Sequence, residues 1–220
     1  MPPRPSRNLD QALLQAGREL FPAAGCAGLS VREVAQKAGV NLGMFHYHFK
    51  TREAFLRALL QSVYEEMYTQ LSFEAATTAD PLRNLRASLR FLGRFLRGNR
   101  AMLARVMADA LCAEPLAVDF LRRNAPRHIG MLFVLMAEAA ARGQLKPLAA
   151  QQALAFCAGS LAAPILFGGA IEESGALKKS DARAIHEALL SDTAIDQRID
   201  LALEAIAAPP KARRRRKAAA

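Results

Sequence analysis

Paired cysteines and a leading apolar segment are both missing from this 220-residue sequence. The three cysteines, Cys26, Cys112 and Cys157, show no paired spacing. Neither a disulfide framework nor a thiolate zinc site is therefore expected. The first residues, MPPRPSR, lack the apolar core of a secretory signal. We expect a protein of the reducing cytoplasm.

Strand-forming residues are sparse, and glycines number only 13. Hydrophobic residues make up 52% of the chain, and alanine and leucine dominate among them. A chain of this length can bury a substantial core, and this composition favours helices. The sequence therefore predicts an all-α fold.

Residue patterns typical of catalytic sites are also missing. We find no nucleophile–base–acid arrangement, no phosphate-cradling glycine loop and no paired carboxylates. His46 and His48 could be mistaken for a metal pair, but residues two apart on a helix face different ways. We therefore expect that the protein is not an enzyme and that it has neither a metal site nor a cofactor.

The positive charge is concentrated at the two ends of the chain. Residues 1–52 hold seven Lys/Arg and three Asp/Glu, and residues 211–217 hold six basic residues and no acidic one. The remaining 17 charges of each sign cancel. A neutral body with two basic ends indicates a polyanionic partner. We divide the chain into a head, 1–52, a helical body, 53–208, and a disordered basic tail, 209–220.

The head shows three helical patterns. Leucines spaced for one helix face predict a first helix over 8–21, and the PAAGCAG that follows should not continue it regularly. Ser30 and Glu33 form a capping-box pattern at the start of a second helix. Gly39 supplies the backbone of a tight turn, after which Asn41 caps a short third helix. Such a short helix must be held from behind, which leaves its other face free.

The stretch SVREVAQKAGVNLGMFHYHFKTREAFL resembles, without a gap, the DNA-binding segment of the TetR/AcrR family of transcriptional regulators. The resemblance implies a three-helix helix-turn-helix head, a linking fourth helix, and a helical body for effector binding and dimerisation. It also implies three partners: double-stranded DNA, a second copy of the chain in a homodimer, and a small-molecule effector. Asn41, Met44 and the HYH at 46–48 depart from the usual pattern. The resemblance therefore predicts how the third helix lies on DNA, but not which bases it contacts.

The resemblance, together with the chemistry of the side chains, predicts which head residues contact DNA. Ring and polar atoms of the third helix suit sugars, thymine methyls and phosphates, while basic residues and helix starts suit phosphates. The predicted DNA-binding residues are Ser30, Arg32, Asn41, Leu42, Gly43, Met44, His46, Tyr47, Lys50 and Arg52.

Further helices are expected across the body, with a kink or break at Pro126. Residues 153–171 carry no charge and are long enough to span a membrane, but their small and helix-breaking residues better fit a buried dimer interface. The apolar stripe of a last helix, 193–207, would join that interface through Ile195, Ile199, Leu203 and Ile206.

Aromatic and methionine residues of the body are candidates for an effector pocket, although at helical spacing they are more often core. The candidates are Phe91, Phe95, Met102, Met107, Phe133, Met136 and Phe156. Because few charges point inward in this interpretation, an apolar or uncharged effector is favoured.

Two functional hypotheses follow. The first is a cytoplasmic, ligand-released repressor that binds a palindromic operator as a homodimer. The alternative is a basic helical protein that binds small molecules or anionic membranes without sequence-specific DNA binding. The membrane itself is not an expected partner under the first hypothesis.

Overall fold

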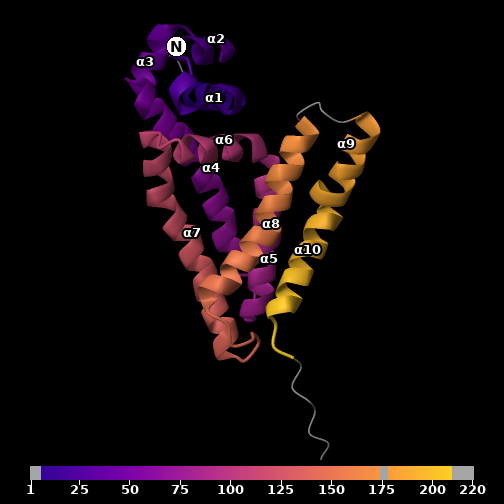
Figure 1. The fold of residues 1–220 in the computed structure, drawn as a ribbon. Helices are drawn as coiled ribbons and strands as arrows, with labels where there is room; N and C mark the ends of the chain where they lie inside the picture. Colours follow the sequence, from indigo (N-terminus) through magenta and orange to yellow (C-terminus); the bar gives the residue numbers. More distant parts are fainter. Residues whose placement is uncertain (1–5, 174–177, 210–220) are drawn as a thin grey trace, which may run out of the picture.

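The computed structural model describes residues 6–173 and 178–209 (Figure 1). Over these ranges regular structure is helical, apart from one isolated bridge between Leu145 and Ala207. The all-α prediction is confirmed. The helices are α1 (Ser6–Gly28), α2 (Val31–Lys37), α3 (Leu42–Phe49), α4 (Arg52–Glu74), α5 (Pro81–Gly98), α6 (Arg100–Leu111), α7 (Pro115–Ala141), α8 (Ala150–Glu173), α9 (Lys179–Ile185), the π-helical turn His186–Leu190, and α10 (Asp192–Ile206).

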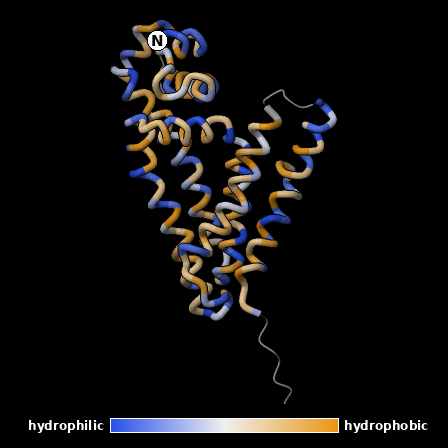
Figure 2. The backbone as a smooth tube through the Cα atoms, viewed as in Figure 1, coloured by the Kyte–Doolittle hydropathy of each residue, from blue (hydrophilic) through white to orange (hydrophobic). Residues whose placement is uncertain are grey.

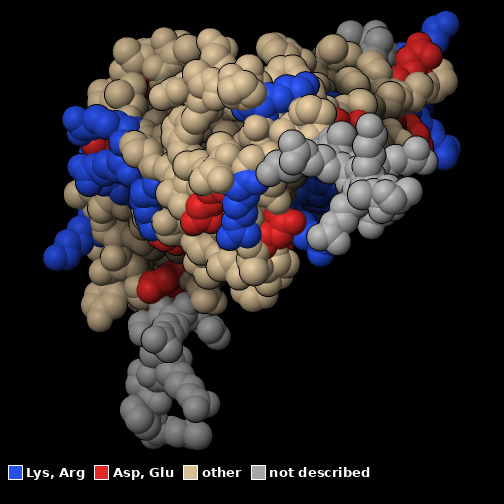
Figure 3. Space-filling view, turned by 90° about the horizontal axis from the view of Figure 1, so that it is seen from below, with Lys and Arg blue, Asp and Glu red and all other residues tan. Residues whose placement is uncertain are grey.

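The head, α1 to α3, lies at one end of the molecule, and α6 lies across the top of the body below it (Figure 1). The predicted basic tail, 209–220, lies outside the described residues apart from Pro209. Hydrophobic and hydrophilic residues alternate along the helices (Figure 2), as amphipathic packing requires. Basic and acidic side chains lie interspersed on the face seen from below (Figure 3), consistent with a neutral body.

The first helix is longer than predicted. It continues past Pro22 to Gly28, with its one non-helical residue at Gly25, where φ is +66°. Phe21 and Cys26, on either side of Gly25, are both fully buried. The regular helix thus extends past Phe21 but is interrupted at Gly25, within the PAAGCAG segment that was expected not to continue it regularly.

Helix α4 joins the head to the body. Thr51 accepts a hydrogen bond from the Ala54 N–H at 3.1 Å and caps the helix. Phe55 near its start is buried in the core of the head, whereas Met67 and Leu71 near its end are buried in the body. The helix runs to Glu74.

The core of the body is built by α5, α7, α8 and α10. Leu85, Leu135, Leu161 and Ile195, one from each of these helices, are buried in a single cluster. Helices α5 and α10 approach closely at Gly93, where an added Cβ would lie 2.7 Å from Ile195 Cγ2. The absence of a side chain at this position therefore allows the close packing.

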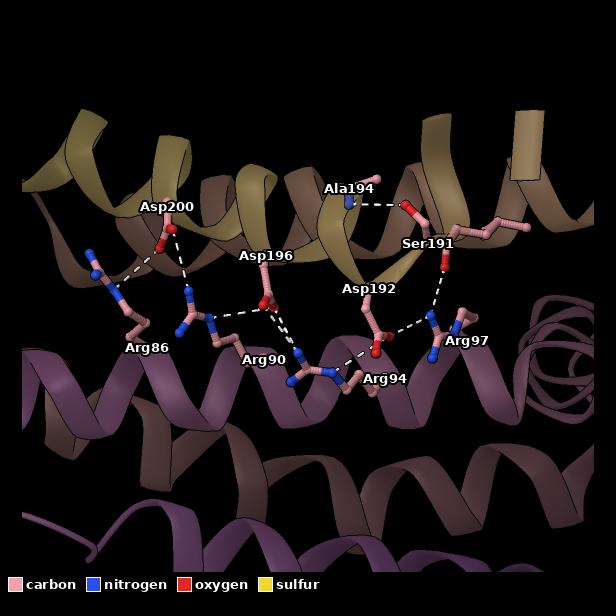
Figure 4. A network of polar contacts seen from close by, with 10 residues as sticks. Arg86, Arg90, Arg94, Arg97, Ser191, Asp192, Ala194, Asp196 and Asp200 are labelled. Carbon is pink, nitrogen blue, oxygen red and sulfur yellow. Dashed lines mark hydrogen bonds and ion pairs between the residues drawn. The ribbon is translucent and has the colours of Figure 1, made fainter. Parts of the chain in front are cut away.

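The outer side of α5 faces the acidic side of α10 (Figure 4). Four arginines and three aspartates alternate, and each aspartate lies between two arginines. The contacts include Arg97 Nη1–Asp192 Oδ1 at 2.7 Å, Arg94 Nη2–Asp196 Oδ1 at 3.0 Å, Arg90 Nη2–Asp200 Oδ2 at 3.4 Å and Arg86 Nε–Asp200 Oδ1 at 3.4 Å. We call this array the Arg–Asp ladder.

Two expectations about the body need correction. The apolar stripe of α10 lies inside the chain's own core, with Ile195, Ile199, Leu203 and Ile206 all nearly fully buried. Helical spacing specifies a buried stripe but not which helix covers it, so the sequence assigned these residues wrongly to a dimer seam. Helix α7 also runs through the exposed Pro126 without a break, which leaves the kink as the part of that expectation that still stands.

Helix α8 has two different sides. Residues 150–171 are long and apolar enough to cross a membrane, by length and composition alone. Leu154, Cys157 and Leu161 are buried against the body, while Phe156 and Phe167 are 50% and 71% exposed. One side of α8 thus belongs to the core of the body, and the other is an unpaired apolar surface.

Candidate nucleic-acid interface and ligand cavity

Local hydrogen bonds set the geometry of the turn between α2 and α3. Ser30 Oγ accepts the Glu33 N–H at 3.4 Å, and Asn41 Oδ1 accepts the Met44 N–H at 2.9 Å. Gly39 between them has φ of +69°, which a glycine adopts without strain. The two caps and the glycine turn are as predicted, and they orient α3 relative to α2.

Helix α3 has one anchored face. Phe45 is fully buried, and its ring lies 5.1 Å from that of Phe55 and 5.7 Å from that of Phe49. The His48 side chain is 6% exposed, and its Nδ1 pairs with Asp10 of α1. These contacts from behind supply the support that an eight-residue helix lacks alone.

The opposite face of α3 points to solvent. Leu42 is 45% exposed and Tyr47 is 75% exposed, and Gly43 and His46 are exposed with them. His46 Nδ1 lies 3.2 Å from the carbonyl oxygen of Lys50. Because a carbonyl can only accept, Nδ1 carries the proton, and the neutral ring has Nε2 as an acceptor.

The predicted phosphate-contacting residues fall into two groups. Arg32 and Lys50 are exposed at the edges of the α2–α3 surface. Arg52 instead points into the head, where Nε donates to the Leu29 carbonyl at 2.8 Å and Nη2 donates to the Cys26 carbonyl. Its guanidinium closes the end of α1, because that end leaves carbonyl groups without helical partners. Arg52 therefore also serves the fold of the head, and its phosphate contact stays a prediction.

The head is joined to the body by a buried carboxylate that the sequence analysis missed. Asp109 of α6 accepts the Cys26 N–H at 2.7 Å and the Arg105 Nε–H at 2.8 Å. Arg105 also donates to the carbonyls of Ala23 and Ala24. The four-residue spacing of Arg105 and Asp109 is the signal in the sequence, but their partners in α1 lie more than 80 positions away.

The body contains a cavity of about 540 Å³ between α4, α5, α7 and α8, with Leu103 of α6 at its wall. This volume suits a small-molecule ligand. Its lining is almost entirely hydrocarbon and includes Met67, Leu92, Phe95, Leu132, Phe133 and Leu161.

The predicted pocket residues are only partly at this cavity. Phe95 and Phe133 line it. Met102 and Met136 are buried in two other core clusters, and Phe91 packs beside the Tyr64–Met67–Leu71 cluster. Met107 and Phe156 are 44% and 50% exposed on the outer surface. Residue type and helical spacing thus predict which helix faces are apolar, but they do not predict where a cavity lies between those faces.

Three polar residues form one end of the cavity, and none was expected from the sequence. Tyr64 donates its hydroxyl proton to the Asn124 carbonyl at 2.7 Å, and Tyr64 Oη lies 3.4 Å from His128 Nδ1. The Asn124 amide is paired with Gln61. Burial raises the pKa of Tyr64 and lowers the pKa of His128, so both are neutral near pH 7.

A capped helix, a glycine turn and a second short helix with one free face define the helix-turn-helix class of DNA-binding proteins. Residues 13–59 match the family model described as "Bacterial regulatory proteins, tetR family". The matched part runs from α1 into α4, so the head of this chain is similar to the DNA-binding segment of TetR-family transcriptional regulators.

Individual relatives agree with this assignment. The HTH-type transcriptional repressor KstR2 of Mycolicibacterium smegmatis is 27% identical over 84 residues, which cover 38% of this chain and 40% of the relative. The matched part thus spans less than half of that curated relative. Among solved structures, the ketosteroid transcriptional regulator KstR2 of Mycobacterium tuberculosis is similar with a TM-score of 0.68 at 17% identity, covering 93% of this chain and 98% of that one. The regulator FadR of Bacillus subtilis, in complex with stearoyl-CoA, has a TM-score of 0.62 at 17% identity, covering 83% and 98%. At these identities the structures show a shared fold.

Proposed function

We propose that this protein is a cytoplasmic transcriptional repressor that binds a palindromic operator as a homodimer and is released by a small molecule in the cavity of its body. The observation that carries the proposal is the geometry of α3, whose buried Phe45 and His48 fix the helix while Tyr47 and its neighbours stay exposed. A short rigid helix with one free face suits insertion into a major groove.

On this proposal the exposed residues divide by task. Leu42, Gly43, His46 and Tyr47 face the bases and sugars, while Arg32 and Lys50 contact phosphates on either side. The N-terminal ends of α2 and α3 add backbone N–H groups that favour phosphate. The predicted residues Ser30, Asn41 and Met44 act mainly through the helix starts, since two of them are the caps and the third supplies a capped N–H.

Fluorescence anisotropy tests the DNA interface. DNA fragments selected by the purified protein supply the operator, and the variant Tyr47→Ala with Lys50→Ala should bind it at least tenfold more weakly. The matched control is Phe73→Ala, which removes a similarly exposed aromatic ring, 66% exposed, at the far end of α4. Equal affinity of the double variant and the parent protein would reject the assignment of α3 as the reading helix.

A second copy of the chain is the proposed occupant of the outer side of α8. Phe156, Ala163, Phe167 and Ile171 are exposed at spacings of seven, four and four residues, which places them on one face. The opposite face is fixed in the core, so the helix is part of the folded bundle, which argues for pairing rather than membrane insertion. Phe167→Glu should therefore convert dimer to monomer in sedimentation-velocity runs.

Two helices could carry a signal from the cavity to the head. Val63 and Met67 of α4 line the cavity, and the same helix begins in the core of the head. Leu103 of α6 also lines the cavity, two residues before the Arg105 that contacts α1. A ligand that binds better to one arrangement of these helices would change the spacing of the two heads and weaken operator binding.

The alternative function, association with anionic membranes, is favoured only by the apolar length of α8 and the basic ends. It predicts co-sedimentation with anionic liposomes and equal binding to unrelated DNA sequences. Preference for the selected operator over scrambled DNA would reject it.

A further inference from the structure

The cavity in the body places a strict limit on the charge of what it holds. The described residues lining it include no Lys, Arg, Asp or Glu, and its one ionisable polar end consists of Tyr64 and His128. A carboxylate or phosphate moved into such a space loses its water and gains no cation, which is strongly unfavourable. The part of a ligand inside the cavity must therefore be uncharged.

The hydrogen bonds at the polar end can be counted group by group. The Tyr64 hydroxyl has one proton, and the Asn124 carbonyl takes it. The Asn124 amide is paired with Gln61 and with the Phe120 carbonyl. Neither residue has a proton left to donate into the cavity.

His128 is the residue at the polar end that can still form a hydrogen bond with a ligand. Because the Tyr64 proton is directed at Asn124, the contact between Tyr64 Oη and His128 Nδ1 places the ring proton on Nδ1. Nε2 of the neutral ring then carries a lone pair and can only accept a hydrogen bond. The polar end formed by Tyr64, Asn124 and His128 thus offers an acceptor and no free donor for a ligand carbonyl, and the further polar lining residue, Gln151 of α8, is exposed to solvent.

From this arrangement we propose that the cavity binds an uncharged lipophilic alcohol, whose hydroxyl donates to His128 Nε2 while its hydrocarbon part fills the space among α4, α5, α7 and α8. The proposal rests on the proposed function in taking this cavity as the effector site. A lipophilic ketone of the same size would leave Nε2 unpaired, and a carboxylate would meet no cation. The selectivity order is therefore alcohol, then ketone, then carboxylate.

Displacement of the uncharged fluorescent probe N-phenyl-1-naphthylamine from the full-length protein tests this order. The competitors are decan-1-ol, 2-decanone and decanoate at pH 8, where decanoate is ionised. Decan-1-ol should displace the probe at a concentration about tenfold lower than 2-decanone, as one net hydrogen bond implies, and decanoate should be weaker still. Decanoate binding as well as the alcohol would overturn the proposal.

Two variants locate the effect. His128→Phe keeps a flat ring and removes both nitrogens, so it should bring decan-1-ol to the level of 2-decanone while leaving 2-decanone unchanged. An unchanged ratio between these two competitors in this variant would also overturn the proposal. Ala162→Phe places a ring in the cavity and should abolish displacement by all three. The comparison of competitors on the unmodified protein stands even if a variant fails to fold.

Anisotropy with operator DNA separates this inference from the proposed function. If decan-1-ol binds in the expected order but leaves the operator complex intact, the ligand class holds and the ligand-released switch is wrong. If the alcohol shows no advantage while operator binding is intact, the DNA-binding function holds and the ligand class is wrong.

Discussion

Asp109 should be among the most sensitive single positions for stability, because it joins the body to the head. Its side chain is 9% exposed and accepts the Cys26 N–H and the Arg105 guanidinium together. Burial raises the pKa of Asp109, but these two donors outweigh burial and hold the pKa below its ordinary value. The carboxylate is therefore ionised and fully paired at neutral pH.

The loss in the free energy of unfolding caused by Asp109→Ala can be estimated from the two groups that lose their partner, the Cys26 N–H and the Arg105 guanidinium. An unpaired buried N–H at Cys26 costs about 1–3 kcal/mol. Removing one partner of a buried ion pair costs about 3–5 kcal/mol. Since the Arg105 side chain is 33% exposed and water can reach it, its loss of a partner costs less than the buried range, and we expect about 3 kcal/mol in total. Asp109→Asn keeps an acceptor for Cys26 and should lose about half as much.

Urea unfolding at fixed protein concentration measures this loss, because a dimer's stability depends on concentration. With a slope of about 2–3 kcal/mol per molar urea, Asp109→Ala should lower the midpoint by about 1 M. Glu66→Gln is the control: its ion pair with Arg18 is exposed, and its loss should change stability by less than about 1 kcal/mol. Coincident midpoints for Asp109→Ala and the parent protein would refute the reasoning.

The pH dependence has a defined sign. A carboxylate whose folded pKa is depressed stabilises the fold above its unfolded pKa, and that contribution is lost as pH falls through the folded pKa. The difference between Asp109→Ala and the parent protein should therefore be full at pH 7 and shrink below the ordinary aspartate pKa of about 4. A difference that grew on acidification would contradict the depressed pKa of Asp109.

Three further predictions concern other contacts. Phe45→Ala removes a fully buried ring from the head and should lower the free energy of unfolding by about 3–5 kcal/mol, measured by urea unfolding. Asn41→Ala removes the α3 cap and should cost about 1 kcal/mol in the same assay, whereas Asn41→Ser should be nearly neutral. A double-mutant cycle on Arg94 and Asp196, which are 40% and 31% exposed, should give a coupling of about 0.2–1 kcal/mol that falls further in 1 M salt.

Features that depend on a few neighbouring residues were predictable from the sequence. The caps at Ser30 and Asn41 and the turn at Gly39 were all predicted, because each joins groups within four positions of one another. The inner and outer faces of α3 were found for the same reason: a helix repeats every 3.6 residues whatever surrounds it. These local features were enough to give the α2–turn–α3 part of the head.

Features that depend on distant partners were not predictable. Arg52 has the sequence position of a phosphate contact, and only the folded head shows it bonded to carbonyls at the end of α1. Ile195 and its neighbours form an apolar stripe that suits a partner chain as well as the chain's own core. The cavity is a space between helices, and no pattern within one helix records it. His128 was therefore not among the predicted pocket residues, because its contact with Tyr64 joins positions 64 apart in the sequence.

The Arg–Asp ladder has a consequence for how α5 and α10 align. Asp192, Asp196 and Asp200 recur every four residues, and the arginines of α5 recur at nearly the same interval. A slide of one helical turn, about 5.4 Å, would bring most of these charges opposite new partners of the correct sign. The ladder therefore tolerates several registers. The close approach of the two helices at Gly93 allows only one register, because every neighbouring position on α5 would set a side chain against Ile195. The ion pairs hold α5 and α10 together, and the absence of a side chain at Gly93 fixes the register in which the two helices pack.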